Sequence, residues 1–237
     1  MSKEEERERC EQPSWMTFIP ITSCIDARTR FHAAPCITTT VVCACKKQGT
    51  SCTRGTCINA AMCRECDTST CSQTSPDRCY NRAFQRGVGC SVAVVDTGTR
   101  RGMGLFCKST VYKGSFVGEY VGEWISGQEH RRRRAKHMGG PSYVMRIANL
   151  NVYIDARRYG NEMRFMNHSC SPNCFTEVWI VGPGSFEEAY AKGALRVGIF
   201  AKHDVPQGTE LTISYSKSFF HDTPCLCGST NCWSKKE

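Results

Sequence analysis

Short apolar segments separated by turn-forming residues run through residues 89–216. Five of them are rich in Val, Ile, Phe and Tyr: SVAVVDT (91–97), GSFVGEYVGEWI (114–125), NVYIDA (151–156), ALRVGIFAKHDV (194–205) and ELTISY (210–215). Such runs, bounded by Gly, Pro, Asn or Asp, are typical of β-strands. PQGT at 206–209 predicts a turn, and the polar stretch near 127–138 predicts one helix. We therefore expect a mostly β domain of short strands.

The chain divides into four parts by composition. Residues 1–35 form a lead segment of mixed composition, and residues 36–88 contain nine cysteines but few large apolar side chains. Residues 89–216 hold most of the strand-forming residues, and residues 217–237 carry the last three cysteines in CLCGSTNCW. The second part cannot build an ordinary apolar core, so another source of stability is expected there.

The N-terminus and the hydropathy pattern bear on the role of the cysteines. The first residues, MSKEEERERCEQP, are charged and lack the apolar core of a secretory signal. No apolar run reaches the roughly 18 residues of a membrane-spanning helix. We therefore expect an intracellular protein without membrane association. In a reducing compartment, 18 cysteines favour metal binding over disulfides.

The formal net charge of +9 indicates a basic surface. Such a surface favours a polyanionic partner or an assembly that contains one. The densest basic patch, Arg131–Arg134, has the composition of an exposed helix. A solvated helical face, a nuclear-import signal and a nucleic-acid contact all remain open for this patch.

The first cysteine cluster has the spacing of a zinc site. Thiolates bind Zn²⁺ in a tetrahedron, and close spacing lets a short loop surround one ion. The cluster comprises Cys43, Cys45, Cys52, Cys57, Cys66, Cys71 and Cys79, with Cys36 and Cys63 as extra cysteines. Its seven thiolates can serve two tetrahedral ions if one sulfur bridges them. Because small polar residues separate the cysteines, zinc is the expected source of folding energy.

The second cluster, Cys225-x-Cys227-x4-Cys232, supplies three thiolates and leaves a tetrahedral site one ligand short. Cys170 and Cys174, in the stretch RFMNHSCSPNC (164–174), are both available as the fourth. The alternative for each is a small buried apolar residue. A ligand role for Cys170 would fasten the C-terminal tail over this stretch and form one pocket at the junction.

Several segments, taken together, resemble the SET-domain lysine methyltransferases. RFMNHSCSPNC is similar to that family's RFxNHSCxPN segment, and GTELTISYS (208–216) to its G-x-E-L-x-x-x-Y segment. RRGMGLF (100–106) resembles the cofactor loop, and GEYVGEWIS (118–126) the strand that follows it. CLCGSTNC resembles the post-SET motif, and the stretch from Cys43 to CYNRAFQRG (79–87) the AWS (associated-with-SET) motif. The segments occur in the family's order from about residue 40 to the end.

The resemblance implies a SET fold of short strands, in which the NHSC and ELxxxY segments thread together in a knot-like arrangement. Zinc-stapled AWS (36–88) and post-SET (217–237) parts would flank a catalytic domain at 89–216. It also implies S-adenosylmethionine as cofactor. The implied cofactor contacts are Arg101, Gly102, Met103, Tyr143, Asn167, His168, Thr223 and Leu226. Asn167 and His168 would then line the cofactor pocket and would not form a proton relay.

The resemblance also implies about three zinc ions. One AWS ion would be held by Cys43, Cys45, Cys52 and Cys57, and the other by Cys52, Cys66, Cys71 and Cys79, with Cys52 bridging. The post-SET ion would be held by Cys170, Cys225, Cys227 and Cys232.

Tyr215 is the implied catalytic residue, whose hydroxyl would orient the lysine nitrogen and contact the transferring methyl group. Without the resemblance, Tyr215 would be interpreted as a core tyrosine at the end of a strand. Ile213 stands where many family members carry Phe or Tyr. Because Ile has no hydroxyl to hold a water there, we expect di- or trimethylation to be allowed.

Three positions depart from the family's pattern. Met103 stands where an aromatic residue is frequent, Pro141-Ser142 where His-Tyr is frequent, and Ser214 where Asp or Asn is frequent. Each change leaves the backbone contacts to the cofactor possible. The three changes together are expected to alter the affinity for the cofactor. The segment GPGSFEEAYAKG (182–193) is longer than the corresponding turn, and both a tolerated surface insertion and a partner contact remain open for it.

AWS-bearing relatives act on histone H3, chiefly in the lysine-36 class, so the resemblance implies a nuclear enzyme of chromosomes that acts on the H3 tail. A basic surface suits a nucleosome, whose DNA attracts it, and recruitment is expected to need a targeting partner. Two alternatives stay open: a methyltransferase of a non-histone protein, and a zinc-stapled chromatin-binding module with little activity. A sequence-specific zinc-finger protein is disfavoured, since Cys2His2 spacing is missing from the clusters.

Overall fold

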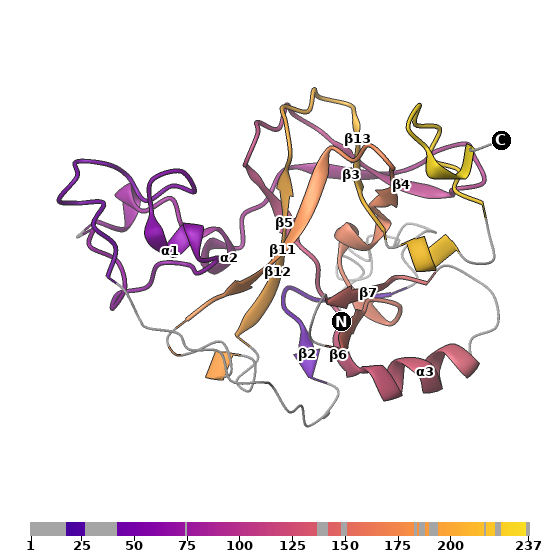
Figure 1. The fold of residues 1–237 in the computed structure, drawn as a ribbon, viewed down its shortest axis with the longest axis horizontal. Coiled ribbons are helices and arrows are strands. Elements are labelled where there is room, and N and C mark those ends of the chain that lie inside the picture. Colours follow the sequence, from indigo (N-terminus) through magenta and orange to yellow (C-terminus); the bar gives the residue numbers. More distant parts are fainter. Residues whose placement is uncertain are drawn as a thin grey trace, which may run out of the picture.

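The computed structural model describes residues 18–26, 42–73, 75–136, 142–147, 151–182, 184, 188–189, 194–215, 217–220 and 224–235. Figure 1 shows a β-rich body with a lobe of loops and short helices at one side. We call this the cysteine-rich lobe; it comprises the described residues of 42–87. The mostly β architecture predicted from the apolar segments is confirmed.

The strands form four small sheets among the described residues. The first has the order β10 (Asn167–His168), β13 (Glu210–Ile213), β4 (Met103–Cys107), β3 (Val92–Asp96). The second has the order β11 (Cys174–Ile180), β12 (Leu195–Ala201), β5 (Phe116–Glu119). The third has the order β2 (Ile25–Asp26), β6 (Glu123–Ser126), β8 (Val152–Asp155), β7 (Val144–Ile147). The fourth pairs β1 (Ile19–Pro20) with β9 (Tyr159–Gly160).

The helices are short apart from one. They are α1 (Ile58–Ala61), α2 (Ala83–Arg86) and α3 (Gly127–Lys136), with 3-10 turns at Pro76–Arg78, Glu162–Phe165, Lys217–Phe220 and Trp233–Lys235. Helix α3 coincides with the predicted helix. No helix of the described residues has the length and apolar character needed to cross a membrane.

Each predicted strand segment contains a strand, and the segment 114–125 contains parts of two, β5 and β6. The break between them lies at Gly122, where a Cβ atom would come within 2.6 Å of the Asp155 carbonyl oxygen. The lead segment is more closely tied to the body than its composition indicates. Strand β1 pairs in parallel with β9, and β2 in parallel with β6, so residues 18–26 lie along the β-rich body.

The apolar core has two parts. The larger lies among the sheets and includes the fully buried Leu105, Ile154, Leu195, Ile199 and Leu211. The smaller joins the cysteine-rich lobe to the second sheet through Phe84, Trp179 and Phe200. Gly198 makes this junction possible, because a Cβ there would lie 2.6 Å from the Phe84 ring. The cysteine-rich lobe is therefore packed onto the sheet that supports the rest of the fold.

Helix α3 carries the Arg131–Arg134 run, and its arginines do not all face solvent. Arg133 turns inward, where its guanidinium pairs with Glu123 at 2.8 Å and with Asp155 at 2.9 Å. Arg131 and Arg134 are exposed, and Arg132 pairs with Glu129 along the helix. The solvated-face interpretation therefore fails for Arg133, while Arg131 and Arg134 remain available to a partner.

We expect Asp155→Ala to lower the free energy of unfolding by about 3–5 kcal/mol. The Asp155 side chain is only 1% exposed and accepts hydrogen bonds from both Arg133 and Arg157. Its removal leaves the Arg157 guanidinium without the carboxylate it pairs with, and Arg133 with Glu123 and Glu129 alone. Urea denaturation measures the change. The exposed Asp77→Ala is the control, expected to stay within about 0.5 kcal/mol; equal losses in both variants would contradict the interpretation.

The same ion pairs predict a pH dependence. Burial alone would raise the pKa of the Asp155 carboxyl, but hydrogen bonds from Arg157 and Arg133 outweigh it and lower the pKa. The contribution of Asp155 to stability is thus fully present above the pKa of an unfolded aspartate, near 3.9, and is lost as the pH falls through the lower folded value.

Candidate functional site: a tyrosine, a cofactor loop and cysteine groups

The 164–174 and 208–216 segments lie side by side at the centre of the site. Strand β10 pairs in parallel with β13, so that Asn167 faces Thr212 and His168 faces Ile213. Asn173, which the sequence analysis did not single out, fixes this pairing. Its side-chain amide donates to the Glu210 carbonyl at 2.8 Å and accepts from the Thr212 amide at 2.8 Å.

Tyr215 is fixed at both ends by this arrangement. Its hydroxyl donates to the Met166 carbonyl oxygen at 2.6 Å, and its backbone amide donates to His168 Nδ1 at 2.9 Å. Burial raises the pKa of the Tyr215 phenol, and the neighbouring Tyr143 and Glu210 raise it further. Tyr215 is therefore a neutral hydroxyl at physiological pH, able to orient a group but not to act as a phenolate base.

His168 is held as a neutral ring. Burial lowers the pKa of His168, which disfavours the imidazolium. Because Nδ1 accepts the Tyr215 amide proton, Nε2 is directed at the Cys170 sulfur, 3.2 Å away. His168 thus connects the tyrosine to the cysteines at the C-terminal end.

The glycine-containing loop at 101–104 contacts the same segments. Asn167 donates to the Met103 carbonyl at 3.1 Å and to the Glu210 carboxylate at 2.8 Å. Arg101 pairs with that carboxylate at 2.8 Å. The structure therefore brings together Arg101, Met103, Asn167 and His168, four of the residues predicted to contact the cofactor.

Gly102 lies in an open position of this loop. Its φ angle is 70°, in the left-handed region, and a Cβ placed there would meet no atom within 4 Å. A glycine with free space above it allows a ligand to approach the backbone closely. The geometry around Gly102 therefore fits a bound cofactor.

Tyr143 lies beside the site on a strained backbone. Its φ angle is 38°, and its carbonyl oxygen accepts from the Tyr120 hydroxyl at 3.0 Å. The Arg164 guanidinium lies 3.6 Å from the centre of the Tyr143 ring, and Phe165 packs edge-on at 5.7 Å. Arg164 also donates to the Ala156 carbonyl oxygen at 2.7 Å, and this hydrogen bond holds its guanidinium against the Tyr143 ring. This role of Arg164 was not predicted from the sequence.

The other predicted positions are placed as follows. Ile213 is 5% exposed and packs into the larger core, and Ser142 is partly buried. Ser214 and Leu226 are exposed. Pro141 and Thr223 lie outside the described residues, as does most of 182–193.

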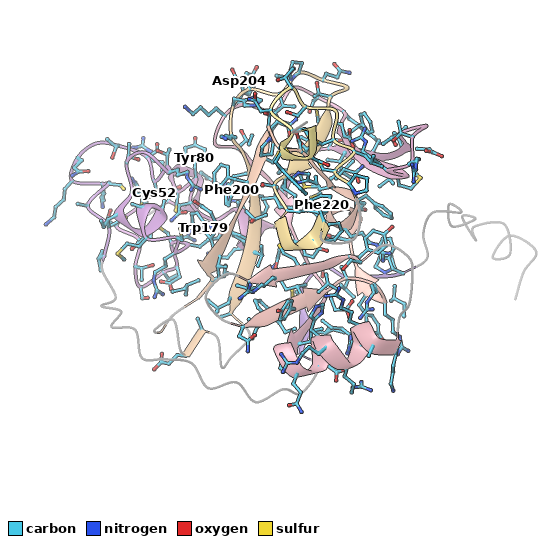
Figure 2. All side chains as sticks on the ribbon, turned by 45° about the vertical axis from the view of Figure 1, so that its right-hand side comes forward. Cys52, Tyr80, Trp179, Phe200, Asp204 and Phe220 are labelled. Atoms are coloured by element: carbon cyan, nitrogen blue, oxygen red, sulfur yellow. The ribbon has the colours of Figure 1, made fainter. Side chains whose placement is uncertain are left out.

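Phe219 and Phe220 are site residues that sequence reasoning missed. The Phe220 ring lies 4.7 Å from His168 and 5.7 Å from Trp233, and Phe219 lies 4.8 Å from Tyr215. Figure 2 shows Phe220 on the short turn that leads to the C-terminal tail. Consecutive aromatic residues between Tyr215 and the tail cysteines were the available signal.

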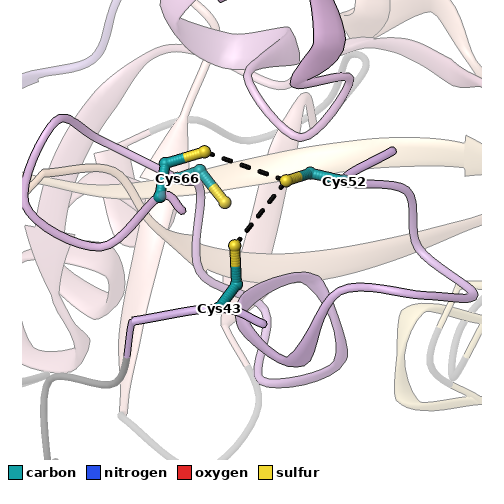
Figure 3. A group of neighbouring side chains, drawn as sticks. Cys43, Cys52 and Cys66 are labelled. Atoms are coloured by element: carbon teal, nitrogen blue, oxygen red, sulfur yellow. Dashed lines mark hydrogen bonds between the residues drawn. The ribbon is translucent and has the colours of Figure 1, made fainter. Parts of the chain in front are cut away.

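Two overlapping groups of thiols lie in the cysteine-rich lobe. One comprises Cys43, Cys45, Cys52 and Cys57, and the other Cys43, Cys52, Cys66 and Cys71, with the sulfurs of each group within 4.8 Å of one another. Figure 3 shows Cys43 and Cys66 beside the central Cys52. The first group has the predicted membership, and Cys43 and Cys52 each belong to both groups. The second contains Cys43 in the place predicted for Cys79, whose thiol interacts with those of Cys66 and Cys71.

The distances between these sulfurs fit zinc. Four thiolates at a Zn–S distance of about 2.3 Å in a tetrahedron stand roughly 3.8 Å apart. The Cys43–Cys52 separation is 3.7 Å, and the Cys52–Cys71 separation is 3.8 Å. Burial opposes ionisation of Cys43, but hydrogen bonds from Ser72 and Cys45 bring the pKa of its thiol to about 6. The separations of these sulfurs are thus those that a tetrahedral zinc ion requires.

A further group lies at the C-terminal end and comprises His168, Cys170, Cys225 and Cys227. Cys170 and Cys225 have sulfurs 3.9 Å apart. The predicted fourth cysteine, Cys232, also interacts with the thiols of Cys170 and Cys225, so His168 Nε2 and the Cys232 sulfur both stand next to the three thiols. The sequence did not single out His168 as a neighbour of this group.

Cysteines outside these groups behave as buried apolar residues. Cys174 is fully buried in the larger core and belongs to none of the three thiol groups, and burial raises the pKa of its thiol to about 12. Burial likewise raises the pKa of Cys24 to about 12, and it raises that of Cys63. All cysteines of the described residues are free thiols, and Cys10 and Cys36 lie outside those residues.

The family model described as "SET domain" matches residues 102–216. The match contains the 102–104 glycine loop, the 164–174 segment and Tyr215.

The chain belongs to the SET-domain family.

Several curated relatives of this SET-domain chain are histone-lysine methyltransferases by name. It is 39% identical over 180 residues to "Histone-lysine N-methyltransferase NSD3" of Mus musculus, covering 74% of this chain and 12% of that protein. It is 38% identical over 180 residues to "Histone-lysine N-methyltransferase, H3 lysine-36 specific" of Homo sapiens, covering 74% of this chain and 6% of that protein. The chain thus spans a small part of the length of these relatives.

A solved structure has the same SET fold. The polycomb repressive complex 2 structure "ctPRC2 in an autoinhibited conformation bound to S-adenosylmethionine" matches with a TM-score of 0.62 and 25% identity, covering 82% of this chain and 26% of that one. The SET fold expected from the sequence motifs is therefore confirmed.

Proposed function

We propose that this SET-domain protein is an S-adenosylmethionine-dependent protein-lysine N-methyltransferase that acts on histone H3, in the lysine-36 class. The observation that carries the proposal is the double fixation of Tyr215, on the Met166 carbonyl and on His168, beside the open Gly102 loop. The names of the curated relatives support the reaction and the substrate class.

Methyl transfer to an amine is an in-line displacement, and bound S-adenosylmethionine supplies the methyl group on a sulfonium sulfur. The attacking lysine must be neutral, although a free lysine has a pKa near 10.4. Withdrawal of the amine from water disfavours the ammonium and lowers that pKa, and the Phe219 ring, 4.8 Å from that of Tyr215, covers this side of the site. Tyr215 holds the amine in line, and alignment supplies much of the rate.

The cofactor would be held by the loop around Gly102 and by the segments joined to it. We assign cofactor contacts to Arg101, Gly102, Met103, Tyr143, Asn167, His168, Thr223 and Leu226. Asn167 also fastens the loop to Glu210, so it positions the loop as well as the ligand.

Zinc would fasten both ends of the chain to the SET body. We assign about three ions, two to Cys43, Cys45, Cys52, Cys57, Cys66, Cys71 and Cys79, and one to Cys170, Cys225, Cys227 and Cys232. The free thiols and their separations support this assignment. His168 beside Cys170 makes the C-terminal ion a neighbour of Tyr215.

The substrate and the cellular place belong to the same proposal. The nucleosome in the nucleus is the proposed substrate, and the exposed Arg131 and Arg134 of α3 are available for its DNA phosphates. A targeting partner would direct the enzyme to its sites. The competing function is a zinc-stapled chromatin-binding module with little activity, motivated by Met103 and Ser142.

Cofactor binding separates these two functions. We expect S-adenosylmethionine to bind the purified chain and Asn167→Ala to bind it roughly tenfold more weakly, because two hydrogen bonds that hold the Met103 loop are lost. Isothermal titration calorimetry measures both affinities, with the melting temperature of each protein as the check on folding. A folded, zinc-loaded chain that binds no S-adenosylmethionine would favour the binding module.

Ile213 determines how many methyl groups we expect on the product. The wild type is expected to form di- or trimethyl-lysine, and Ile213→Tyr to shift the product towards monomethyl-lysine, because a hydroxyl there can hold a water in the space of a methyl group. Mass spectrometry of a histone H3 peptide after extended reaction measures the distribution. Strict monomethylation by the wild type would contradict this assignment.

A further inference from the structure

A cavity of about 240 Å³ lies where the cysteine-rich lobe meets the second sheet. It is remote in sequence from the residues assigned to methyl transfer. Its walls include five aromatic residues, Tyr80, Phe84, Phe116, Trp179 and Phe200, beside polar ones such as Thr53, Asn81 and Ser115. Figure 2 shows Tyr80, Trp179 and Phe200 close together at this junction, and Tyr80 is 61% exposed.

These rings already bind a cation from the chain itself. The Arg54 guanidinium lies 4.8 Å from the centre of the Phe200 ring, 5.3 Å from that of Phe175 and 5.8 Å from that of Trp179. Glu177 pairs with Arg54 and accepts a hydrogen bond from the Trp179 indole at 3.1 Å. Because Glu177 neutralises the charge of Arg54, the guanidinium adds no net positive charge to the cavity.

A buried carboxylate adds negative charge to the cavity wall. Glu65 lines the cavity and is 1% exposed. It accepts from the Phe84 amide at 2.6 Å and from the backbone and side-chain amides of Gln85 at 3.1 and 3.0 Å. None of the ion pairs among the described residues involves Glu65, and nearby Arg196 is paired with Glu119.

The hydrogen bonding of Glu65 decides which cation suits the cavity. A carboxylate offers about four acceptor positions, and three donors already occupy positions on Glu65. A primary ammonium brings three donors, of which the Glu65 carboxylate has room for about one. A quaternary ammonium brings none, is weakly hydrated and is attracted by aromatic faces. The volume, below the roughly 300–1,000 Å³ of pockets for drug-sized ligands, suits a single side chain.

We propose that this cavity binds the trimethyl-lysine side chain of a basic peptide, between the rings of Tyr80, Phe84, Trp179 and Phe200 and beside Glu65. This inference does not depend on the proposed methyl transfer. A site of this kind would let the protein hold an already methylated chain while its catalytic site stays free.

The test uses the whole zinc-loaded chain and two histone H3 peptides that differ only in one lysine, unmodified or trimethylated. The indole N–H signal of Trp179 in nuclear magnetic resonance spectra, assigned through Trp179→Phe, reports on this cavity and not on the catalytic site. We expect the trimethylated peptide to shift this signal at concentrations at least tenfold below those needed for the unmodified peptide.

Two tyrosines give a matched pair of variants. Tyr80→Ala removes a wall of the cavity and is expected to weaken binding of the trimethylated peptide roughly tenfold. Tyr112→Ala removes a similarly exposed ring, 67% exposed, that does not line the cavity, and it should leave binding unchanged. Glu65→Gln removes the negative charge and should also weaken binding. An unmoved Trp179 signal, equal binding of the two peptides, or equal behaviour of the two tyrosine variants overturns the proposal.

Discussion

Cys52→Ser is expected to remove two zinc ions and to unfold the cysteine-rich lobe. Cys52 belongs to both thiol groups of that lobe, so both sites lose a ligand with a single substitution. A structural zinc contributes about 10–16 kcal/mol of apparent binding free energy in small zinc domains, which exceeds the stability of many whole domains. The few large apolar side chains of the lobe cannot replace that contribution.

The zinc content of the purified protein measures this effect. We expect about three ions per chain in the wild type and about one in Cys52→Ser, with a lower melting temperature and loss of the packing of Phe84 on Phe200. Cys63→Ser is the matched control: Cys63 lies in the same lobe outside both thiol groups, and it should keep all ions. Loss of a single ion in Cys52→Ser would show that Cys52 does not bridge two sites.

Tyr215→Phe is expected to lower the methyl-transfer rate roughly 10²-fold with little change in cofactor affinity, and to lower the free energy of unfolding by about 1–3 kcal/mol because the buried Met166 carbonyl loses its donor. Phe keeps the ring in its pocket but cannot donate to the Met166 carbonyl, so the group that would align the lysine is lost. A small misplacement of reacting groups costs about 10²-fold in rate. Since burial raises the pKa of this phenol, the loss is one of orientation, and it should be equal at pH 7 and pH 9.

Initial rates at saturating S-adenosylmethionine measure this prediction. A second substitution, Tyr112→Phe, removes an exposed hydroxyl elsewhere and should leave the rate unchanged. A Tyr215→Phe protein with wild-type rates would show that the hydroxyl has no part in the reaction.

The strands that could be predicted from the sequence are those with continuous β-branched and aromatic runs. SVAVVDT and ALRVGIFAKHDV satisfy this condition and form β3 and β12. Strand β4 escaped prediction because RRGMGLF was interpreted as a loop, although its residues 103–107 extend beside β3 and β13. Strands β1 and β2 are two residues long and depend on partners more than 90 residues away, so they leave no local signal.

In the candidate site, too, some features could be predicted from the sequence and others could not. The spacing of the cysteines was sufficient to predict that thiols gather at both ends of the chain, and Cys170 lies with the tail cysteines as expected. The position of His168 beside that group could not be predicted, because it depends on the parallel pairing of β10 with β13. The ring contacts of Arg164 and Phe220 likewise arise only when distant segments meet.

The central claim, methyl transfer to a lysine of histone H3, is tested most directly by incubating the wild-type chain with labelled S-adenosylmethionine and recombinant nucleosomes. Mass spectrometry of the histones then locates the label. The proposal predicts label on a single lysine of H3, in the lysine-36 class. A folded, zinc-loaded protein that binds S-adenosylmethionine but places no label on H3 would contradict it and would direct the search to a non-histone substrate.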